Sequence, residues 1–364
     1  MGQQAGDESA GGTSVHPDAV PGRMDVVRDR SGNMRGLVHA SLVILVILPA
    51  GLAVQGAQEA DTVALFADLQ FMRGFLLSYP DSSMGHSVEA VLHLDDVDNV
   101  PVWRLCQWGT KHSLAGAPCV RSGHGDFCYE NPAKTVIVGE PNSPNRDLVL
   151  ELRGKLEYGA NVRGPGDNWP HLLIEQDAIH LFPLDRLDRI QFDASLRLLY
   201  CTNHMTEDQS DPGLHAAQFQ MFFIIKNINA TSEDRGGYYW FGVPFYDSRY
   251  DVPPAYMARD AGKDDATGKF IYTLDGKVTG ATSLKEGRWT TLRVDLLPHI
   301  KDGLQEAVKR GYLQSSDPAE YAVANMNLGW EMPGTFDAAI QVRNLRVLAL
   351  PADNMRAAVR GWGD

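Results

Sequence analysis

The stretch AQFQMFFIIKNI at residues 217–228, followed by GYYWFGVPFYDSR at residues 237–249, decides the fold. In the first segment two glutamines alternate with Phe219 and Met221, and in the second Tyr238 and Trp240 occupy every second position, opposite a set of apolar residues. A period of two is typical of a β-strand with one buried face, because successive side chains point to opposite sides of a sheet. The two segments therefore predict two long strands that bury one face and present polar and aromatic groups on the other.

Similar segments recur along the chain from residue 63 onward. They lie at 89–94, 135–138, 147–157, 171–176, 191–200, 269–274, 288–295, 323–330 and 336–349. Clusters of Gly, Pro and Asn, such as 139–145 and 163–168, separate them. Many β-rich segments divided by such turns are typical of a sandwich or jelly roll. We therefore predict an all-β fold, an antiparallel β-sandwich of the jelly-roll type with one or two short helices in its connections.

One segment has helical periodicity instead. Pro298 stands at a good first-turn position, Ile300 and Leu304 recur at helical spacing, and Gly311 follows as a C-cap. This helix is expected to pack against the sandwich as a connection between strands. The stretch 316–320 predicts a second, shorter helical start.

The N-terminal region is expected to direct export. Arg35, the apolar run 42–48, the helix breaker Pro49 and small residues before Ala57 form the three parts of a signal peptide at 34–57. Polar residues interrupt the apolar stretch, so a stable membrane span is not expected. Residues 1–33 are interpreted as a disordered tail or a mis-annotated start, and 58–364 as a single β-sandwich domain. The expected location is secreted or periplasmic.

Charge restricts the partners of the exported chain. The formal net charge is −13, and residues 1–57 contribute five acids and four bases, which leaves −12 on residues 58–364. So acidic a surface argues against nucleic acid and anionic lipid. A neutral sugar and a protein partner both remain compatible with it.

Four cysteines, Cys106, Cys119, Cys128 and Cys201, allow two disulfides in an oxidising compartment, with three connectivities. Cys119 and Cys128 flank a Gly-rich loop that a bridge would close. The rival interpretation is a zinc site with nearby histidines. No Cys-x-x-Cys pair exists, so disulfides or free thiols are favoured over a metal.

Strand parity also predicts which polar side chains share a face. If the core residues Leu172 and Ile174 point inward, the alternate residues of that strand point outward, and the same reasoning applies to the strands at 217–228, 237–245 and 323–330. Amides, carboxylates and aromatic rings recur on these outward positions. They could be ordinary solvent-facing residues of an antiparallel sheet. Sugars, however, need this mixture, because amides and carboxylates bind hydroxyls and Trp and Tyr rings pack on sugar C–H faces.

The predicted binding residues are Trp169, Gln218, Gln220, Tyr238, Trp240, Arg249, Asn325 and Asn327, and the predicted catalytic residues are Glu175, Glu331, His171 and Asp247. Glu175 and Glu331 are the paired carboxylates that a glycosidase requires, with Asp247 in reserve. A lyase acting on a uronate polymer would instead use His171 as base and Tyr246 as acid. Both sets can be drawn from this sequence. A non-catalytic carbohydrate-binding protein and a structural envelope protein are the alternatives.

At fold level the pattern resembles the jelly-roll, concanavalin-A-like sandwiches of carbohydrate-active proteins. The resemblance spans residues 65–350 and rests on the strand pattern together with WPHLLIEQ, YYWFGVPFYDSR and NLGWEMPGTFD. It implies an oligo- or polysaccharide as partner and hydrolysis or β-elimination as the reaction, if there is one. The Glu-x-Asp-x-x-Glu strand of β-glucanases is absent, as is the Gln-x-His and Tyr-x-Lys pair of alginate-lyase-like sandwiches. The chain is also similar to uncharacterised exported bacterial proteins, and fold resemblance does not establish function.

No cofactor is required by this chemistry. The acidic loop at 93–99 is a candidate Ca²⁺ site because hard cations take several oxygen ligands, although it lacks the spacing of a calcium-loop motif. A solvated acidic turn is the alternative.

Overall fold

The computed structural model describes residues 61–94, 100–262 and 266–353. The tail and signal peptide predicted within 1–57 lie outside these residues, as do the acids of the candidate Ca²⁺ loop at 95–99.

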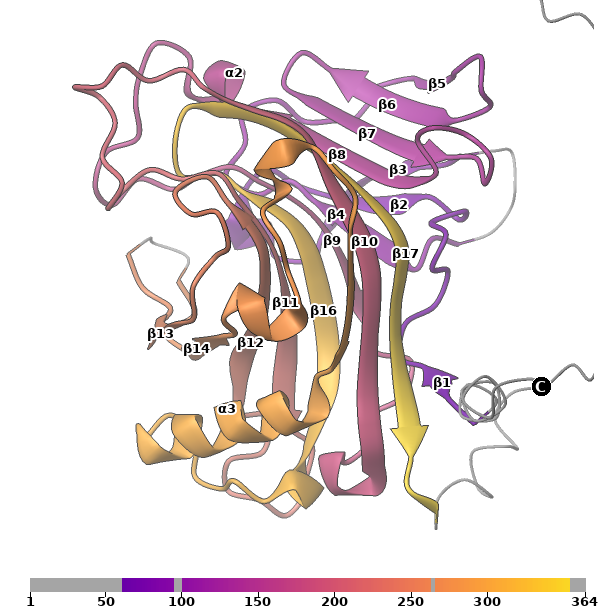
Figure 1. Cartoon of the computed structure of the whole chain (residues 1–364), viewed down its shortest axis with the longest axis vertical. Coiled ribbons are helices and arrows are strands. Elements are labelled where there is room, and N and C mark those ends of the chain that lie inside the picture. The colour runs from indigo at the N-terminus through magenta and orange to yellow at the C-terminus, as the bar shows by residue number, and fades with distance from the viewer. Residues whose placement is uncertain (1–60, 95–99, 263–265, 354–364) are drawn as a thin grey trace, which may run out of the picture. The chain divides into compact units, whose positions relative to one another are not determined.

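Two β-sheets form the framework of the described chain (Figure 1). The eight-stranded sheet contains, in spatial order, β15 (Thr290–Asp295), β10 (Leu187–Asn203), β17 (Phe336–Pro351), β8 (Asp147–Arg153), β7 (Lys134–Gly139), β6 (Phe127–Asn131) and β5 (Cys119–Arg121), with β1 (Val63–Ala64) also paired to β17. The nine-stranded sheet contains β13 (Tyr256–Arg259), β14 (Phe270–Thr273), β12 (Tyr238–Asp247), β11 (Gln218–Asn227), β16 (Tyr321–Glu331), β9 (His171–Asp177), β4 (Trp103–Cys106), β2 (Phe75–Ser78) and β3 (Val88–Leu92).

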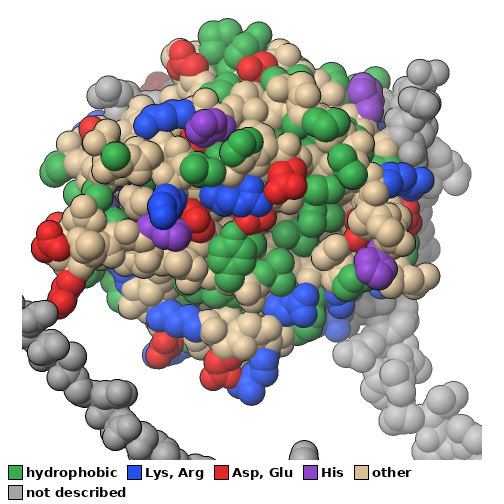
Figure 2. Space-filling model, turned by 90° about the horizontal axis from the view of Figure 1, so that it is seen from above, with side chains coloured by type: hydrophobic (Ala, Val, Ile, Leu, Met, Phe, Trp, Pro, Cys, Tyr) green, Lys and Arg blue, Asp and Glu red, His purple; other side chains and the backbone are tan. Residues whose placement is uncertain are grey.

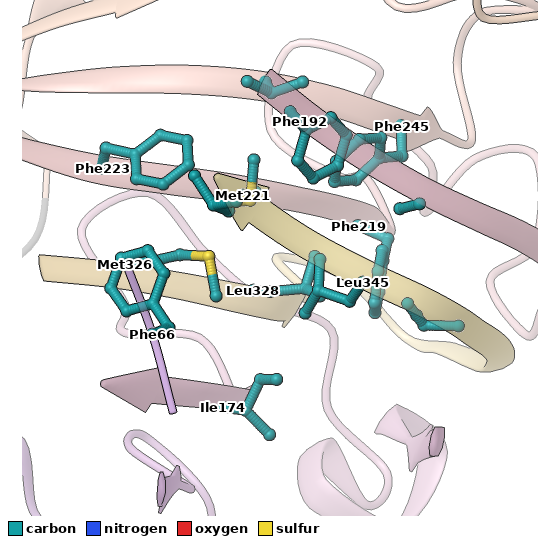
Figure 3. Close-up of a cluster of buried hydrophobic side chains, with 14 of the residues drawn as sticks. Phe66, Ile174, Phe192, Phe219, Met221, Phe223, Phe245, Met326, Leu328 and Leu345 are labelled. Carbon is teal, nitrogen blue, oxygen red and sulfur yellow. The ribbon is translucent and has the colours of Figure 1, made fainter. Parts of the chain in front are cut away.

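A single hydrophobic core lies between the two sheets. Figure 3 shows Phe219, Met221, Phe223 and Leu328 of the nine-stranded sheet near Phe192 and Leu345 of the other. Phe192 stacks on Phe245 with ring centroids 5.8 Å apart, and the indole N–H of Trp330 donates to the carbonyl of Leu150 across the core at 2.9 Å. The predicted all-β sandwich is therefore confirmed.

Helices occur only in the connections between the described strands. α3 (Leu297–Lys309) begins with Pro298 in its first turn and buries Ile300 and Leu304, as its periodicity predicts. It lies against Tyr239, whose hydroxyl donates to the carbonyl of Ile300. α2 (Gly154–Tyr158) is one turn long, and η1 (Ser82–Met84), η2 (Leu184–Arg186), η3 (Gly276–Thr279), η4 (Leu284–Glu286) and η5 (Pro318–Glu320) are short 3-10 turns. The helical start predicted at 316–320 corresponds to η5, capped by Asp317.

Two strand predictions need correction. The strand expected at 147–157 ends at Arg153, where α2 begins with Gly154. A Cβ at position 154 would lie 2.5 Å from the carbonyl oxygen of Phe336, so only glycine fits at this turn. β1, β2, β4, β5, β6 and β13 were not predicted. Each is only two to five residues long, which is too short for an alternating pattern to stand out.

The predicted Cys119–Cys128 disulfide is absent, and all four cysteines are free thiols. β5 and β6 form a hairpin in which Cys119 lies opposite Tyr129 and Cys128 lies opposite Val120. Because cross-strand partners share a face and adjacent residues do not, the two cysteines project from opposite sides of the hairpin.

This arrangement predicts unequal thiol reactivity. Cys119 is exposed, whereas Cys106 is fully buried and burial raises the pKa of its thiol. Only the thiolate reacts, so we expect iodoacetamide to modify Cys119 in the native protein and Cys106 only after unfolding. Mass spectrometry of peptides from native and denatured samples would measure this. Protection of Cys119 and Cys128 that reductant relieves would instead show a disulfide.

Within the described residues, no helix is both long enough and apolar enough to cross a bilayer.

Candidate functional site

The outward side of the nine-stranded sheet carries most of the predicted site. Ten of the outward side chains of β9, β16, β11 and β12 make up what we call the polar face: His171, Glu175, Gln218, Gln220, Tyr238, Trp240, Asp247, Asn325, Asn327 and Glu331. The apolar residues Leu173, Phe222 and Ile224 also point outward among them. The intervening residues of the same strands, among them Leu172, Phe219 and Trp330, are buried in the core. Strand parity therefore places nine of these side chains on one face, and a β-bulge in β12 adds the tenth, Asp247.

One row of polar groups crosses four strands at one end of this face. In the strand register, Glu331 of β16 lies opposite both His171 of β9 and Gln218 of β11, and Gln218 lies opposite Asp247 of β12. Directly opposite residues on neighbouring strands are about 5 Å apart. The four side chains thus form a continuous line of hydrogen-bonding groups about 15 Å long.

Glu331 is the most accessible of the carboxylates on this row. Its side chain is 20 % exposed, and its two oxygens accept hydrogen bonds from the Gln220 amide and the Trp169 indole N–H, each at 3.1 Å. The Nε2 atom of His171 lies 3.6 Å from the same carboxylate. Two neutral donors and an imidazole therefore lie beside this carboxylate.

His171 is buried, with 6 % of its surface exposed. Its backbone N–H donates to the carbonyl of Trp108, and its Nδ1 atom lies 3.3 Å from the same oxygen, which accepts only from a protonated Nδ1. This contact directs Nε2 toward Glu331. A buried, backbone-bonded imidazole fits a positioning role better than the predicted lyase base.

Arg104, which no pattern in the sequence singles out, neutralises Glu175. Arg104 of β4 lies directly opposite and donates two hydrogen bonds to one carboxylate oxygen, at 2.6 and 2.9 Å. His86 lies 3.3 Å from that oxygen. Arg104 also donates a hydrogen bond to Asp177. Burial acts to raise the pKa of the Asp177 carboxyl, but hydrogen bonds from Arg104 and Asn325 outweigh it and leave that pKa below its usual value. Glu175 is 4 % exposed and belongs to an ion-pair network.

The two glutamates are separated along the sheet. Glu175 is paired with Asn327, four residues from Glu331 on β16, which corresponds to about 13 Å along the strand. Glu331 is held near His171, and Glu175 is held near Arg104 and Asn325, on the side away from Glu331. Glycosidase carboxylates lie about 5–9.5 Å apart. The structure does not bring this pair together as that chemistry requires.

Gly329 lies between these two positions on β16. A Cβ there would approach the carbonyl oxygen of Leu172 to 2.3 Å, so β9 and β16 pass too close for any side chain. Leu173, which lies opposite Gly329 in the strand register, thus packs over this part of the face between Glu331 and Asn327.

A β-bulge places Asp247 in the row. Phe219 lies opposite Tyr246 and Gln220 lies opposite Pro244, so Phe245 is an extra residue. Asp247 consequently ends β12 on the polar face, rather than lying beyond the strand as predicted. It is 5 % exposed, accepts from Gln218 at 2.9 Å, and receives two hydrogen bonds from Arg249 side-chain nitrogens at 2.9 and 2.7 Å.

The same bulge turns Tyr246 toward the core. Its ring packs edge-on against Trp330 with centroids 5.9 Å apart, and burial raises the pKa of its hydroxyl. Tyr246 is thus on the other side of the sheet from His171. The predicted pairing of these two as base and acid of a lyase is wrong.

Aromatic rings flank the face at two places. Trp169 stacks on His171 with centroids 6.0 Å apart, and the guanidinium of Arg163 lies 4.8 Å from the Trp169 ring centroid. At the other end, Trp240 packs edge-on against Tyr238 and donates its indole N–H to Thr267 at 3.1 Å. Both tryptophans are partly exposed.

The structure has a pocket of about 440 Å³ elsewhere, lined by Leu198, Leu199, Tyr200, Cys201, Tyr246, Lys285, Glu286 and Gly287. Of the residues predicted to take part in binding or catalysis, only Tyr246, the predicted lyase acid, lines it. Figure 2 shows one end of the molecule, where acidic, basic and histidine side chains are interspersed without a large area of one charge. Within 61–94, 100–262 and 266–353, no group of three His, Cys, Asp or Glu residues could hold a metal ion.

No protein-family model and no curated protein matches the chain. Solved structures similar to it include a meso-active, thermo-stable cellulase derived from Cel12A of Rhodothermus marinus, with 14 % identity, a TM-score of 0.33 and coverage of 68 % of this chain and 99 % of that one. Another is the family 12 xyloglucanase of Bacillus licheniformis, with 11 % identity, a TM-score of 0.36 and coverage of 64 % and 97 %. A third is the family 11 xylanase of Neocallimastix patriciarum, with 10 % identity, a TM-score of 0.31 and coverage of 62 % and 90 %. Identities and TM-scores this low carry no activity or site residue to this chain.

Proposed function

We propose that the protein binds an oligo- or polysaccharide on the polar face, after export directed by residues 34–57. The observation that carries the proposal is the row of His171, Glu331, Gln218 and Asp247, with Trp169 stacked at its end. Carboxylate and amide groups bind sugar hydroxyls in pairs, and an indole ring packs on the C–H face of a pyranose. A row about 15 Å long matches two to three sugar rings.

Binding without cleavage is the form of this function that the geometry supports best. Glu175 forms an ion pair with Arg104, and Asp247 forms one with Arg249. An amide, an indole and an imidazole lie beside Glu331. The other carboxylate of the row, Asp247, is therefore held in an ion pair and does not serve as the partner that a glycosidase requires.

Hydrolysis is the second candidate, favoured by Glu331 alone. Its accessible carboxylate lies beside an imidazole on the same face as Trp169 and Trp240. In that case Glu331 would be the general acid or base, and a substrate group or water would complete the reaction.

A glycan array with the purified mature protein tests the proposal directly. We expect binding to at least one oligosaccharide, followed by neither new reducing ends nor new ultraviolet absorbance when the protein is incubated with that glycan. New reducing ends would establish hydrolysis, and absorbance from an unsaturated product would establish elimination. If no glycan is bound at millimolar concentration, the protein does not have this function.

A further inference from the structure

The outward side of the eight-stranded sheet carries a cluster of arginines that differs in kind from the polar face. Arg197 of β10 and Arg343 of β17 project outward from adjacent strands, and Arg146 lies immediately before β8. We call Arg146, Arg197, Arg343 and Trp289 the arginine cluster. Neither Arg197 nor Arg343 forms an ion pair with any described residue, in a chain whose formal net charge is −13.

Trp289 holds the two central guanidiniums. The guanidinium carbon of Arg343 lies 3.9 Å from its ring centroid and that of Arg197 lies 5.0 Å from it. A guanidinium packed on an indole face keeps its in-plane N–H groups for other partners. The Nε donors of Arg197 and Arg343 are buried and have no hydrogen-bond acceptor among the described residues.

Gln341, which is fully buried, links the segments of the cluster through its side-chain amide. Its amide donates to the carbonyls of Pro144 and Arg146, and its oxygen accepts from Arg197 at 2.8 Å. Gln341 thereby fixes the 144–146 segment over the sheet beside β17. The site is therefore built from four separate chain segments held by specific contacts.

Charge in the cluster is unbalanced. Arg343 is surrounded by Arg197 and Arg146, with Asp147 as the nearby acid, and Asp147 already pairs with Arg146 at 3.4 Å. Desolvation and the two neighbouring arginines lower the pKa of Arg343, although Asp147 acts in the opposite direction. The next arginines on this sheet, Arg293 and Arg346, are different, because each forms an ion pair with Asp193 at 3.1 Å.

We propose that the arginine cluster binds the carboxylate of a uronate residue in an acidic oligosaccharide. Two guanidiniums packed on the same indole ring keep their in-plane N–H groups for a ligand. Such paired N–H donors match the two oxygens of a carboxylate. The hydroxyls of Ser195 and Thr291, which bond each other at 2.8 Å beside Arg343 in the strand register, would face the sugar hydroxyls. This site goes beyond the proposed function, since it lies on the other sheet and selects a charged sugar.

An acidic sugar suits the cluster better than a nucleic acid. The chain carries 46 acidic against 33 basic residues, so a polymer with two phosphates per base pair would be repelled outside the cluster. A uronate chain carries only one charge per ring. Fewer of its charges therefore lie beside the acidic residues outside the cluster than in a duplex.

The test compares oligogalacturonate with its methyl ester on the unmodified protein, by isothermal titration calorimetry at low salt. The two ligands differ in charge and in little else. We expect the free acid to bind at least tenfold more tightly than the ester, and its affinity to fall as salt is raised. Equal affinity for acid and ester would overturn the proposal, and so would tighter binding of duplex DNA than of oligogalacturonate.

Variants then locate the site. Arg343→Gln should weaken oligogalacturonate binding at least tenfold, whereas Arg293→Gln, which removes an arginine already paired with Asp193, should change it less than twofold. Equal effects of the two variants would show that the cluster is not the site. If Arg343→Gln fails to fold, Arg343→Lys keeps the charge but removes the paired donors, and severalfold weaker binding is expected. Unchanged affinity in this variant would count against the proposal.

Failure here is distinguishable from failure of the proposed function. Neutral glycans should bind the polar face equally well in the Arg343 variants, and substitutions at Glu331 should leave oligogalacturonate binding unchanged.

Discussion

Substituting Lys134 by Met is expected to destabilise the protein by about 3–5 kcal/mol, the largest loss that we predict for a single charged residue. Lys134 is 0 % exposed and lies 2.6 Å from the carboxylate of Glu157, which is 3 % exposed. Desolvation lowers the pKa of Lys134, and Glu157 partly offsets this effect. Removing the ammonium leaves a buried carboxylate without its cation, and that carboxylate cannot regain water.

Lys309→Met is the matched control. It removes a Lys–Glu contact of almost the same length, 2.7 Å to Glu306, but Lys309 is 74 % exposed. Ion pairs in water contribute little, so its free energy of unfolding should stay within experimental error. Urea denaturation of both variants would measure the difference. Equal stability losses would show that the Lys134–Glu157 pair is not isolated from solvent.

The Lys134→Met substitution should also weaken glycan binding at the polar face. Lys134 donates to the carbonyl of His112, and Glu157 accepts from the backbone N–H of Lys111. These contacts hold the segment that includes Trp108, whose carbonyl orients His171. A folded Lys134→Met protein should therefore bind glycan more weakly than Lys309→Met.

Glu331→Ala is expected to weaken glycan binding by about thirtyfold or more, the scale of a central interface residue. The carboxylate orders the Trp169 indole and the Gln220 amide, so its loss removes a ligand acceptor and releases two neighbouring groups. Calorimetric titration with the best array ligand would measure the effect.

Glu130→Gln provides the control for that experiment. Glu130 is a carboxylate on the outward side of the eight-stranded sheet, 57 % exposed and paired with Arg153. Its substitution should leave glycan affinity unchanged. If Glu331→Ala binds as well as Glu130→Gln, the polar row does not recognise the sugar.

Strand parity was sufficient to predict the long strands of the polar face. In β9, in β11 and in the part of β16 after Asn325, every second residue is buried in the core, so burial of Ile174 or Phe223 also fixes the direction of the neighbours. A register shift at Ala324 breaks this count in the first half of β16. Alternation within one strand carries no information about which distant segments pair with it. Arg104 lies 71 residues before Glu175 in a four-residue strand, and nothing in WRLC indicates that it neutralises that carboxylate.

The same limit explains the other corrections. Parity counts assume a regular strand, and the extra residue in β12 exchanged the sides expected from simple counting for Tyr246 and Asp247. Lys134 begins a strand of apolar residues, where a lysine would normally reach solvent, and only the fold brings Glu157 over it. Cysteine spacing likewise cannot show that two thiols leave a hairpin on opposite sides.

The bulge in β12 also determines where this strand tolerates a change of length. Phe245 and Tyr246 both point inward, so deleting Phe245 would restore simple alternation and leave every other residue of β12 on its present side. The deletion would cost the stack on Phe192. Deleting Phe241 instead would shift the frame of one half of the strand against the other, exposing core rings or burying Trp240. Evolution can therefore lengthen or shorten β12 at one position without rebuilding the surface that the strand presents.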